Sequence, residues 1–380
     1  MNDVSATPHF TPRPRVAVVF GGRSSEHAIS CVTAGSVLAA IDRSKYDVLP
    51  IGIGTDGRWM LVGDDPTRLA IRGDELPTVT DVAESTAALV LAADPTSREI
   101  TMLEPGVLPK LLGEIDVVFP LLHGPYGEDG TFQGFLELAQ VPYVGSGVFA
   151  SAASMDKEYM KAVFAGFGLP SGPYTTVRPR DWERDPAAVR AAVSALGFPV
   201  FVKPARAGSS MGITKVHRIE DLDAALEEAR RHDPKVIVEG MLTGREIECG
   251  VLEFEDGPRA SLPAEVRVGG DHEFYDFAAK YLPDNGTELD VPAALSPEQT
   301  AEVQRLAVAA FEALSCEGLA RVDFFLLENG QFVINEVNTM PGFTPVSMFP
   351  SMWQATGVDY AELVDRLIQA ALRRPNQLLR

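Results

Sequence analysis

The sequence contains little cysteine and no long apolar segment. Its three cysteines, Cys31, Cys249 and Cys316, lie far apart without metal-ligand spacing, which argues against a disulfide framework or a cysteine metal site. We therefore expect buried, reduced thiols and a cytoplasmic protein. No stretch approaches the roughly 20 apolar residues that a membrane-spanning helix needs, and residues 1–15 lack the apolar run of a signal peptide.

Basic residues are also in deficit. The 380 residues include 33 Lys and Arg against 53 Asp and Glu, so the formal net charge is -20 at pH 7. Nucleic acid and anionic membrane would be repelled by such a surface, and we expect a small-molecule substrate instead. With 46% hydrophobic and 23% charged residues, the composition is that of a globular protein, and the length allows two or three domains.

The first part of the chain alternates apolar strands with helical segments, which predicts an open, parallel α/β sheet over residues 1–145. Residues 16–22 read as a buried strand, and 24–41 as a helix. Further expected elements are strands at 47–54 and 115–124, a helix at 131–140 and a short strand at 141–145.

The rest of the chain predicts two α+β units, at 146–243 and 244–380. The first would hold a helix that ends near Gly168, two strands around a small-residue loop at 208–212, a helix at 221–232 and a strand at 236–240. The second would hold a hairpin and two helices, at 297–314 and 358–373. The polar, aromatic stretch 267–290 has the composition of a lid or binding loop.

Residues 321–342 predict a tight hairpin, because Asn329-Gly330 between two β-rich runs is a strong turn signal, with both residues at positive φ. Glu328 then faces Gln331. Counting outward from that pair places Asp323 opposite Glu336 and Arg321 opposite Asn338, all on one face. The other face is expected to be core and comprises Val322, Phe324, Leu326, Val333 and Val337.

Two opposed carboxylates on neighbouring strands destabilise a sheet unless a positive charge lies between them. Asp323, Glu336 and Asn338 offer the oxygen ligands that suit Mg²⁺ or Mn²⁺, with water and substrate phosphates completing the shell. The alternative is that the register is shifted by one residue and both acids are solvated. That shift would turn the apolar residues outward, so we favour the metal site.

The glycine-rich loop 208–212 is no P-loop, because the lysine and the hydroxyl residue of that motif are missing and a strand follows it. Lys203 ends the preceding strand, so backbone N–H groups and an ammonium could meet phosphates there. Lys157 is a second candidate, although either lysine alone is typical of a solvated surface. Glu239 and Glu246 flank a connecting segment that could bind adenine and ribose.

Together these stretches resemble the D-alanine D-alanine ligase family of the ATP-grasp superfamily. The resemblance runs through GGRSSEHAIS, HGPYGEDGT, MDK, VKPARAGSSMG, VEGMLTGREIE, FYDFAAKY, ARVDFF and NEVNTMPGFTPVSM. It implies a three-domain ATP-grasp architecture with an N-terminal sheet domain, a central lid domain and a C-terminal domain. It also implies a homodimer, ATP as co-substrate and two Mg²⁺ or Mn²⁺ ions on Asp323, Glu336 and Asn338.

The resemblance further implies the remaining site residues. ATP would contact Lys157 and Lys203 through its phosphates, Glu239 near adenine and Glu246 near ribose, together with Ser210 and Leu242. The first D-alanine would place its ammonium near Glu26 and its carboxylate near His123. Lys280 and Ser347 would lie close to the second D-alanine or the transferred phosphoryl group, and Ser209 and Tyr281 would join Glu26 in closing the lid.

The chemistry follows from the reactants. A carboxylate is a poor acyl donor, so it first takes the γ-phosphoryl group of ATP, and the resulting acyl phosphate is attacked by an amine. The oxyanion of that attack needs donors, for which Arg321 and the Gly342 N–H are candidates. The expected product is D-alanyl-D-alanine for peptidoglycan synthesis.

Two other functions stay open. A sibling ligase would use D-lactate or D-serine as second substrate, and Tyr281 bears on that choice. A non-catalytic nucleotide sensor would need neither Arg321 nor Lys280. Among single residues, His123 could be an ordinary loop-end histidine, Glu26 a helix-capping acid and Tyr281 a packing residue.

Overall fold

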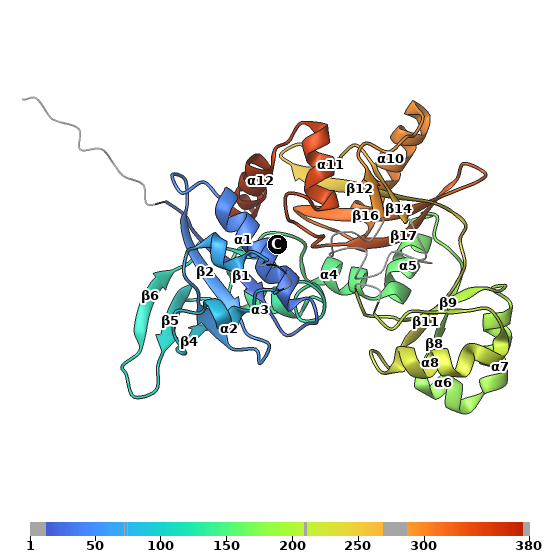
Figure 1. The fold of residues 1–380 in the computed structure, drawn as a ribbon, viewed down its shortest axis with the longest axis horizontal. Coiled ribbons are helices and arrows are strands. Elements are labelled where there is room, and N and C mark those ends of the chain that lie inside the picture. Colours follow the sequence, from blue (N-terminus) through green and yellow to red (C-terminus); the bar gives the residue numbers. More distant parts are fainter. Residues whose placement is uncertain (1–12, 72, 74, 209–210, 269–286, 375–380) are drawn as a thin grey trace, which may run out of the picture.

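The structure is a computed structural model, and it describes residues 13–71, 73, 75–208, 211–268 and 287–374 (Figure 1). The strands form four sheets, and the helices pack around them. Among the helices of the described ranges, none has the length and apolar character needed to cross a bilayer.

The N-terminal sheet has the strand order β3-β2-β1-β7. The strands β1, β2 and β7 run parallel, as expected, and β3 is an antiparallel edge. Its strands are β1 (Arg15–Gly21), β2 (Asp47–Ile53), β3 (Trp59–Leu61) and β7 (Val117–Pro120). The associated helical segments are α1 (His27–Ala40), η1 (Pro66–Leu69), α2 (Val79–Val82) and α3 (Thr131–Leu138). The open parallel sheet predicted from the sequence is therefore confirmed.

Two features of this half differ from the prediction. The strand expected at 141–145 is only an isolated bridge between Val118 and Tyr143, because Pro142 lacks the N–H that a longer ladder would need. A separate three-stranded antiparallel sheet was missed. It consists of β4 (Ala88–Leu91), β5 (Glu99–Leu103) and β6 (Lys110–Glu114).

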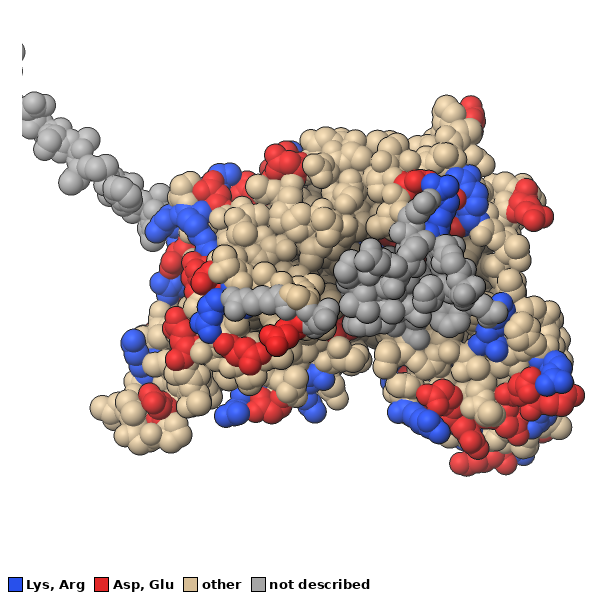
Figure 2. Space-filling view, viewed as in Figure 1, with Lys and Arg blue, Asp and Glu red and all other residues tan. Residues whose placement is uncertain are grey.

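The central sheet is antiparallel, with the strand order β10-β9-β11-β8, and α6, α7 and α8 lie together on one side of it (Figure 1). Figure 2 shows acidic and basic side chains interspersed over these helices. The strands are β8 (Tyr174–Val177), β9 (Val200–Pro204), β10 (Thr214–Val216) and β11 (Val236–Gly240). The helical segments are α6 (Pro179–Arg184), α7 (Pro186–Ser194), η2 (Ile219–Asp221) and α8 (Leu222–Arg230).

The helix predicted ahead of this sheet is two helices, α4 (Val148–Met155) and α5 (Lys157–Gly166). The break falls at Asp156, which has extended backbone and accepts a hydrogen bond from the Tyr159 N–H as the N-cap of α5. Their apolar side chains share a core with the C-terminal sheet. The shared residues are Ala150, Ala153, Met160 and Phe164.

The C-terminal sheet has the order β15-β14-β12-β16-β17, with β13 paired to β12. Its strands are β12 (Gly244–Phe254), β13 (Gly257–Ala260), β14 (Ala264–Val268), β15 (Thr287–Asp290), β16 (Leu319–Leu327) and β17 (Phe332–Asn338). The helices are α10 (Pro297–Ala313), α11 (Met348–Thr356) and α12 (Tyr360–Arg373), of which α11 was not predicted. The division of the chain after residues 145 and 243 stays a prediction.

The β16–β17 hairpin has the predicted pairs at its base but not at its turn. Asp323 is opposite Glu336 and Arg321 opposite Asn338, as expected. At the turn, however, Leu327 and not Glu328 is bonded to Gln331, and only Gly330 has positive φ. The loop therefore contains three residues instead of two, which shifts the register by one.

A bulge restores the register. The ladder shifts between Asp323 and Phe324, where Asn335 is the extra residue on β17. The one-residue shift at the turn and the opposite shift at the bulge cancel. The predicted pairs on the polar face are therefore correct, although the predicted two-residue turn was wrong. Val333 is buried, as expected, but it lies opposite Phe325 and therefore on the same face as Asp323 and Glu336, not on the face predicted for it. The core face carries Val322, Phe324, Leu326, Phe332, Ile334 and Val337.

Alanine substitutions at two glycines compare this turn with an ordinary helical position. Gly330 has φ of 82°, so Gly330→Ala should lower the unfolding free energy by about 1 kcal/mol. Gly134 lies inside α3 with no atom within 4 Å of a built Cβ, so Gly134→Ala should raise it by about 0.5–1 kcal/mol. Urea unfolding of both variants measures the difference. Equal effects would contradict the left-handed turn.

Candidate active site

Two adjoining cavities lie beside the central and C-terminal sheets. The larger, of about 320 Å³, is bounded by β9, β11, the segment 240–244 and the strands β12, β16 and β17. The smaller, of about 90 Å³, is bounded by loops of the N-terminal part and by residues 336–342. Both cavities are lined by Lys157 and Glu336, so these two side chains mark the place where they meet.

The predicted residues divide between the cavities. Those that line the larger one are Lys157, Lys203, Glu239, Leu242, Glu246, Asp323 and Glu336. Those that line the smaller one are Glu26, His123, Lys157, Arg321, Glu336, Asn338 and Gly342. Ser209, Ser210, Lys280 and Tyr281 lie outside the described residues, as does most of the expected lid loop, and their roles stay predictions.

A buried carboxylate between two lysines forms one wall of the larger cavity. Glu239 lies 2.8 Å from the Lys161 Nζ and 2.6 Å from the Lys203 Nζ. Burial alone would raise the pKa of Glu239, but the charges of Lys203 and Lys161 hold it well below its ordinary value. The group is therefore an ionised acceptor that faces the cavity.

Lys161 was missed in the sequence, although its spacing offered a signal. It lies four residues after Lys157 on α5, and therefore on the same face of that helix. Its side chain is only 2% exposed, which is rare for a lysine without a partner. Buried together with Glu239, it completes an ion-paired cluster.

Lys157 connects the glycine-rich loop with the polar face of the hairpin. Its Nζ donates to the Ala207 carbonyl oxygen at 3.0 Å and lies 3.6 Å from the Glu336 Oε2. An ammonium held between a backbone loop and a carboxylate is well placed to meet a phosphate group.

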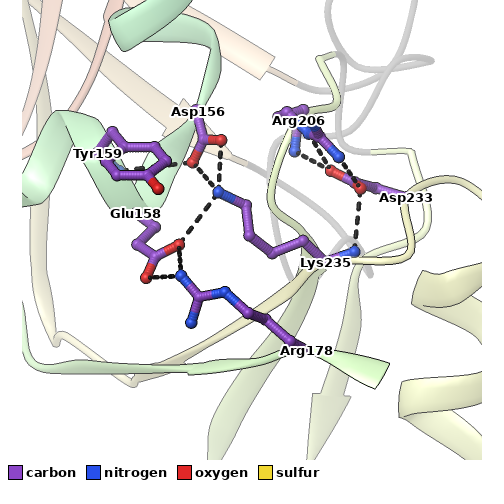
Figure 3. A network of polar contacts seen from close by, with 7 residues as sticks. All are labelled: Asp156, Glu158, Tyr159, Arg178, Arg206, Asp233 and Lys235. Carbon is purple, nitrogen blue, oxygen red and sulfur yellow. Dashed lines mark hydrogen bonds and ion pairs between the residues drawn. The ribbon is translucent and has the colours of Figure 1, made fainter. Parts of the chain in front are cut away.

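A network of ion pairs fixes the start of α5 to the central sheet (Figure 3). The Lys235 Nζ donates to Asp156 at 2.6 Å and to Glu158 at 3.1 Å, and Arg178 donates to both oxygens of Glu158 at 2.6 and 2.8 Å. Arg206 donates to both oxygens of Asp233, and Asp233 also accepts from the backbone N–H of Lys235 at 3.0 Å. Because α5 carries two of the lysines and β9 the third, the network fixes their relative positions.

The polar face of the hairpin carries its own cation. Arg321 donates to both oxygens of Asp323, at 2.7 and 2.8 Å, and its Nε lies 3.1 Å from the Glu248 Oε2. Burial would lower the pKa of Arg321, but the charges of Asp323 and Glu248 raise it above its ordinary value. The positive charge expected between the opposed acids is thus supplied in part by Arg321 and Lys157.

The donor set of this face fits a hard divalent cation. Asp323 and Glu336 provide carboxylate oxygens, and Asn338 uses its Nδ2 to donate to Asp323 at 2.9 Å, which leaves its Oδ1 for a ligand. Within the described ranges, no three His, Cys, Asp or Glu residues are grouped as metal ligands. A bound Mg²⁺ or Mn²⁺ would therefore need water or phosphate oxygens to complete its shell.

The smaller cavity has a histidine and two acids on its N-terminal side. The Nδ1 of His123 lies 3.2 Å from the Met340 carbonyl oxygen, and its buried Nε2 has no hydrogen-bond partner among the residues that the structure describes. Burial lowers the pKa of His123. Glu26 makes no side-chain capping bond to α1; a Cβ built on Gly124 would lie 2.7 Å from its Oε2. Glu26 is the N-cap residue of α1 and also lines the smaller cavity, and its role in the site stays a prediction.

Glu128 belongs to the same cavity and was not predicted, although it lies in the HGPYGEDGT stretch. Its Oε2 accepts from the Gly124 N–H at 2.6 Å and its Oε1 from the Met340 N–H at 3.3 Å. Burial, together with the charge of Glu26, raises the pKa of Glu128 to about 8. Glu128 thus links the N-terminal loop to the loop that contains Gly342.

Ser347 lies beside Gly342 rather than on the cavity wall. Its Oγ accepts from the Thr344 N–H at 3.1 Å, and a Cβ built on Gly342 would lie 3.3 Å from it. The three cysteines are buried and unpaired, as expected, and burial raises the pKa of each thiol to about 12.

The sequence matches two family descriptions that together span most of the chain. Residues 15–146 match "D-ala D-ala ligase N-terminus", and residues 163–369 match "D-ala D-ala ligase C-terminus". A D-alanine--D-alanine ligase of Streptomyces griseus is 67% identical over 371 residues, which cover 96% of this chain and 94% of that protein.

Solved structures with the same fold include two ligases. The VanG D-Ala:D-Ser ligase from Enterococcus faecalis has a TM-score of 0.82 and 33% identity, covering 95% of this chain and 100% of that one. The D-alanine-D-alanine ligase from Coxiella burnetii has a TM-score of 0.80 and 34% identity, covering 97% and 96%. The overall fold is therefore shared with a D-Ala:D-Ser ligase and a D-alanine-D-alanine ligase.

The raised pKa of Glu128 predicts that the stability of the protein depends on pH. Between its ordinary pKa of 4.5 and about 8, the folded protein holds a proton that the unfolded chain has released, so stability should fall as pH rises through that window. Glu128→Gln mimics the protonated form and should flatten the slope by up to about 1.4 kcal/mol per pH unit. Unfolding free energies from pH 5 to 8 measure it. An unchanged slope would show that Glu128 does not hold the proton.

The ion pairs of Glu239 with Lys161 and Lys203 predict how substitutions in this cluster change the stability. Glu239→Gln leaves Lys161 and Lys203 buried together, so it should lower the unfolding free energy by about 3 kcal/mol. Adding Lys161→Met in that background should recover about 1 kcal/mol or more, whereas Lys161→Met alone should not stabilise the parent. Chemical denaturation of the four proteins completes the cycle. Equal effects of Lys161→Met in both backgrounds would refute the coupling.

Proposed function

The chain belongs to the D-alanine D-alanine ligase family, and from this premise we propose that it joins two D-alanine molecules in a reaction that converts ATP to ADP and phosphate. The observation that carries the proposal is the meeting of the two cavities at Lys157 and Glu336, beside Asp323 and Asn338. A nucleotide in the larger cavity would present its terminal phosphate to a small acid in the other.

ATP is proposed to occupy the larger cavity. Its phosphates would contact Lys157, Lys203 and the loop residue Ser210, and its adenine would lie near Glu239 and the Leu242 backbone, with ribose near Glu246. Asp323, Glu336 and Asn338 would hold two Mg²⁺ or Mn²⁺ ions. The metal would supply neutralisation of the phosphate charge.

The first D-alanine is proposed to occupy the smaller cavity. Glu26 would hold its ammonium group, and the buried Nε2 of His123 would face its carboxylate. That carboxylate attacks the γ-phosphorus of ATP, the bond to the ADP oxygen breaks, and D-alanyl phosphate results. The lysine ammonium at the junction stabilises the charge that spreads over the transferred group.

The amine of the second D-alanine then attacks the acyl carbon, phosphate leaves, and a peptide bond forms. Arg321 and the Gly342 N–H are proposed to bind the oxyanion, each such donor being worth about 3 kcal/mol. Ser347 and Lys280 would lie near this substrate. Ser209, Tyr281 and Glu26 would close the lid and keep water from the acyl phosphate.

The alternatives differ in the second substrate. A solved relative with a similar fold is a D-Ala:D-Ser ligase, so fold alone does not separate the two activities. The 67% identity to a D-alanine--D-alanine ligase favours D-alanine. A non-catalytic sensor is disfavoured because it would not need Arg321 beside the metal ligands. We propose a cytoplasmic homodimer that provides the dipeptide for peptidoglycan.

A substrate panel tests the function. The full chain with ATP and Mg²⁺ should release phosphate with D-alanine, and mass spectrometry should identify D-alanyl-D-alanine as the main product. The L-enantiomer should support less than about a hundredth of the rate, because a misplaced amine or carboxylate loses the oriented geometry. Preferred use of D-serine or D-lactate would select the sibling ligase, and no release with any compound would refute the ligase reading.

A further inference from the structure

Three carboxylates lie in a row across three neighbouring strands of the C-terminal sheet. Glu248 on β12 is directly opposite Asp323 on β16, and Asp323 is opposite Glu336 on β17. Neither the sequence nor the proposed mechanism assigns a task to Glu248. Its side chain is only 7% exposed, and a buried acid needs a partner.

The partner is Arg321. The Arg321 Nε donates to the Asp323 Oδ1 at 2.7 Å and lies 3.1 Å from the Glu248 Oε2, so the guanidinium forms ion pairs with both acids. In the register of β12 and β16, Arg321 itself is opposite Gly250, which has no side chain. Glu248, two residues away on the same face of β12, is therefore the acid of that strand placed to reach the guanidinium.

Asp323 has two competing demands on its oxygens. Both already accept from Arg321, and the Oδ2 also accepts from Asn338. A divalent cation that binds Asp323 competes with the guanidinium for the negative charge of the same carboxylate, which weakens those bonds. Arg321 would then be a buried charge with a weakened counterion, and such a state is strongly disfavoured.

We propose that Glu248 is a positioning residue that holds the Arg321 side chain in place when Asp323 binds the divalent cation. The guanidinium then keeps its place on the wall of the smaller cavity, where the oxyanion forms. Arginine has five N–H donors, so an arginine anchored by one carboxylate still has donors for a reacting oxygen. The inference rests on the proposed function for the oxyanion step.

A role for Glu248 as a metal ligand is a different reading of the same row. The Arg321 Nε lies 3.1 Å from the Glu248 Oε2, so this carboxylate already has a cation as its partner. The two readings predict different behaviour once Arg321 is removed. A positioning residue loses its effect, whereas a ligand keeps it.

Mn²⁺ binding without turnover separates them. Mn²⁺ affinity in the presence of ADP would be measured by electron paramagnetic resonance for the parent, Glu248→Gln, Arg321→Ala and the double variant. Glu248→Gln should weaken Mn²⁺ binding about tenfold, since Arg321 then depends more strongly on Asp323 as its counterion. In the Arg321→Ala background the same change should alter affinity less than about twofold.

Two outcomes would overturn the proposal. Weakening of similar size in the Arg321→Ala background would mean that Glu248 acts on the metal directly. No weakening in the parent background would mean that Glu248 does not relieve Asp323. Glu265→Gln provides a matched control, because Glu265 also lies on this sheet and pairs with Arg245 at 2.8 and 2.6 Å. It should leave Mn²⁺ affinity unchanged.

The coupling of the half-reactions gives a second readout. Glu248→Gln should release several phosphates per dipeptide, with a KM for ATP within about twofold of the parent, because a displaced Arg321 impairs amine attack more than phosphoryl transfer. Glu265→Gln should keep the parent ratio, and a parent ratio in Glu248→Gln would count against the proposal. If the parent makes no dipeptide, the proposed function fails, and the Mn²⁺ cycle still decides the task of Glu248.

Discussion

Two carboxylates on adjacent strands, Asp323 and Glu336, would repel each other, and the rest of the site depends on how that repulsion is balanced. Without ligands the balance comes from different elements. Arg321 is on the same strand as Asp323, whereas Lys157 reaches Glu336 from the start of α5. Because α5 is fixed to the central sheet by the Lys235 network, the position of the hairpin's counter-charge depends on the neighbouring unit. The charge balance of the metal face therefore connects two sheets that have separate cores.

The cavity walls are lined by charges of alternating sign. Lys161, Glu239 and Lys203 form one such row, and Glu248, Arg321 and Asp323 form another. Each of these six charges has a partner of opposite sign before any substrate arrives, so these donors and acceptors are held in place by the fold. Such preorganised dipoles and charges need little rearrangement when charge develops during reaction. A phosphate or a divalent cation that enters would replace some of these bonds without changing the alternation.

The sequence predicted the elements whose signals are local and missed those that depend on packing. The apolar run of β1 and the acid pair at Asp323 could be read from the chain, because burial and alternation leave a pattern. Lys161, Glu128 and Glu248 could not, because a charged residue becomes a site residue only when folding buries it against a partner. Their neighbours carried weak signals: helix spacing for Lys161, and a motif already quoted for Glu128. Ser209, Ser210, Lys280 and Tyr281 lie outside the described residues, so the roles expected for the lid stay predictions.

The hairpin shows why a correct pairing can follow from an incorrect count. A three-residue turn with Gly330 in the left-handed region moves the ladder by one residue, and the bulge at Asn335 moves it back before Glu336. The core-facing residues near the turn are paired in one strand register, and the polar residues at the base of the hairpin are paired in another. A bulge also lets two successive side chains, Asn335 and Glu336, face the larger cavity, which a regular strand cannot do. The bulge therefore lies between the part of the hairpin that packs in the core and the part that carries the candidate metal ligands.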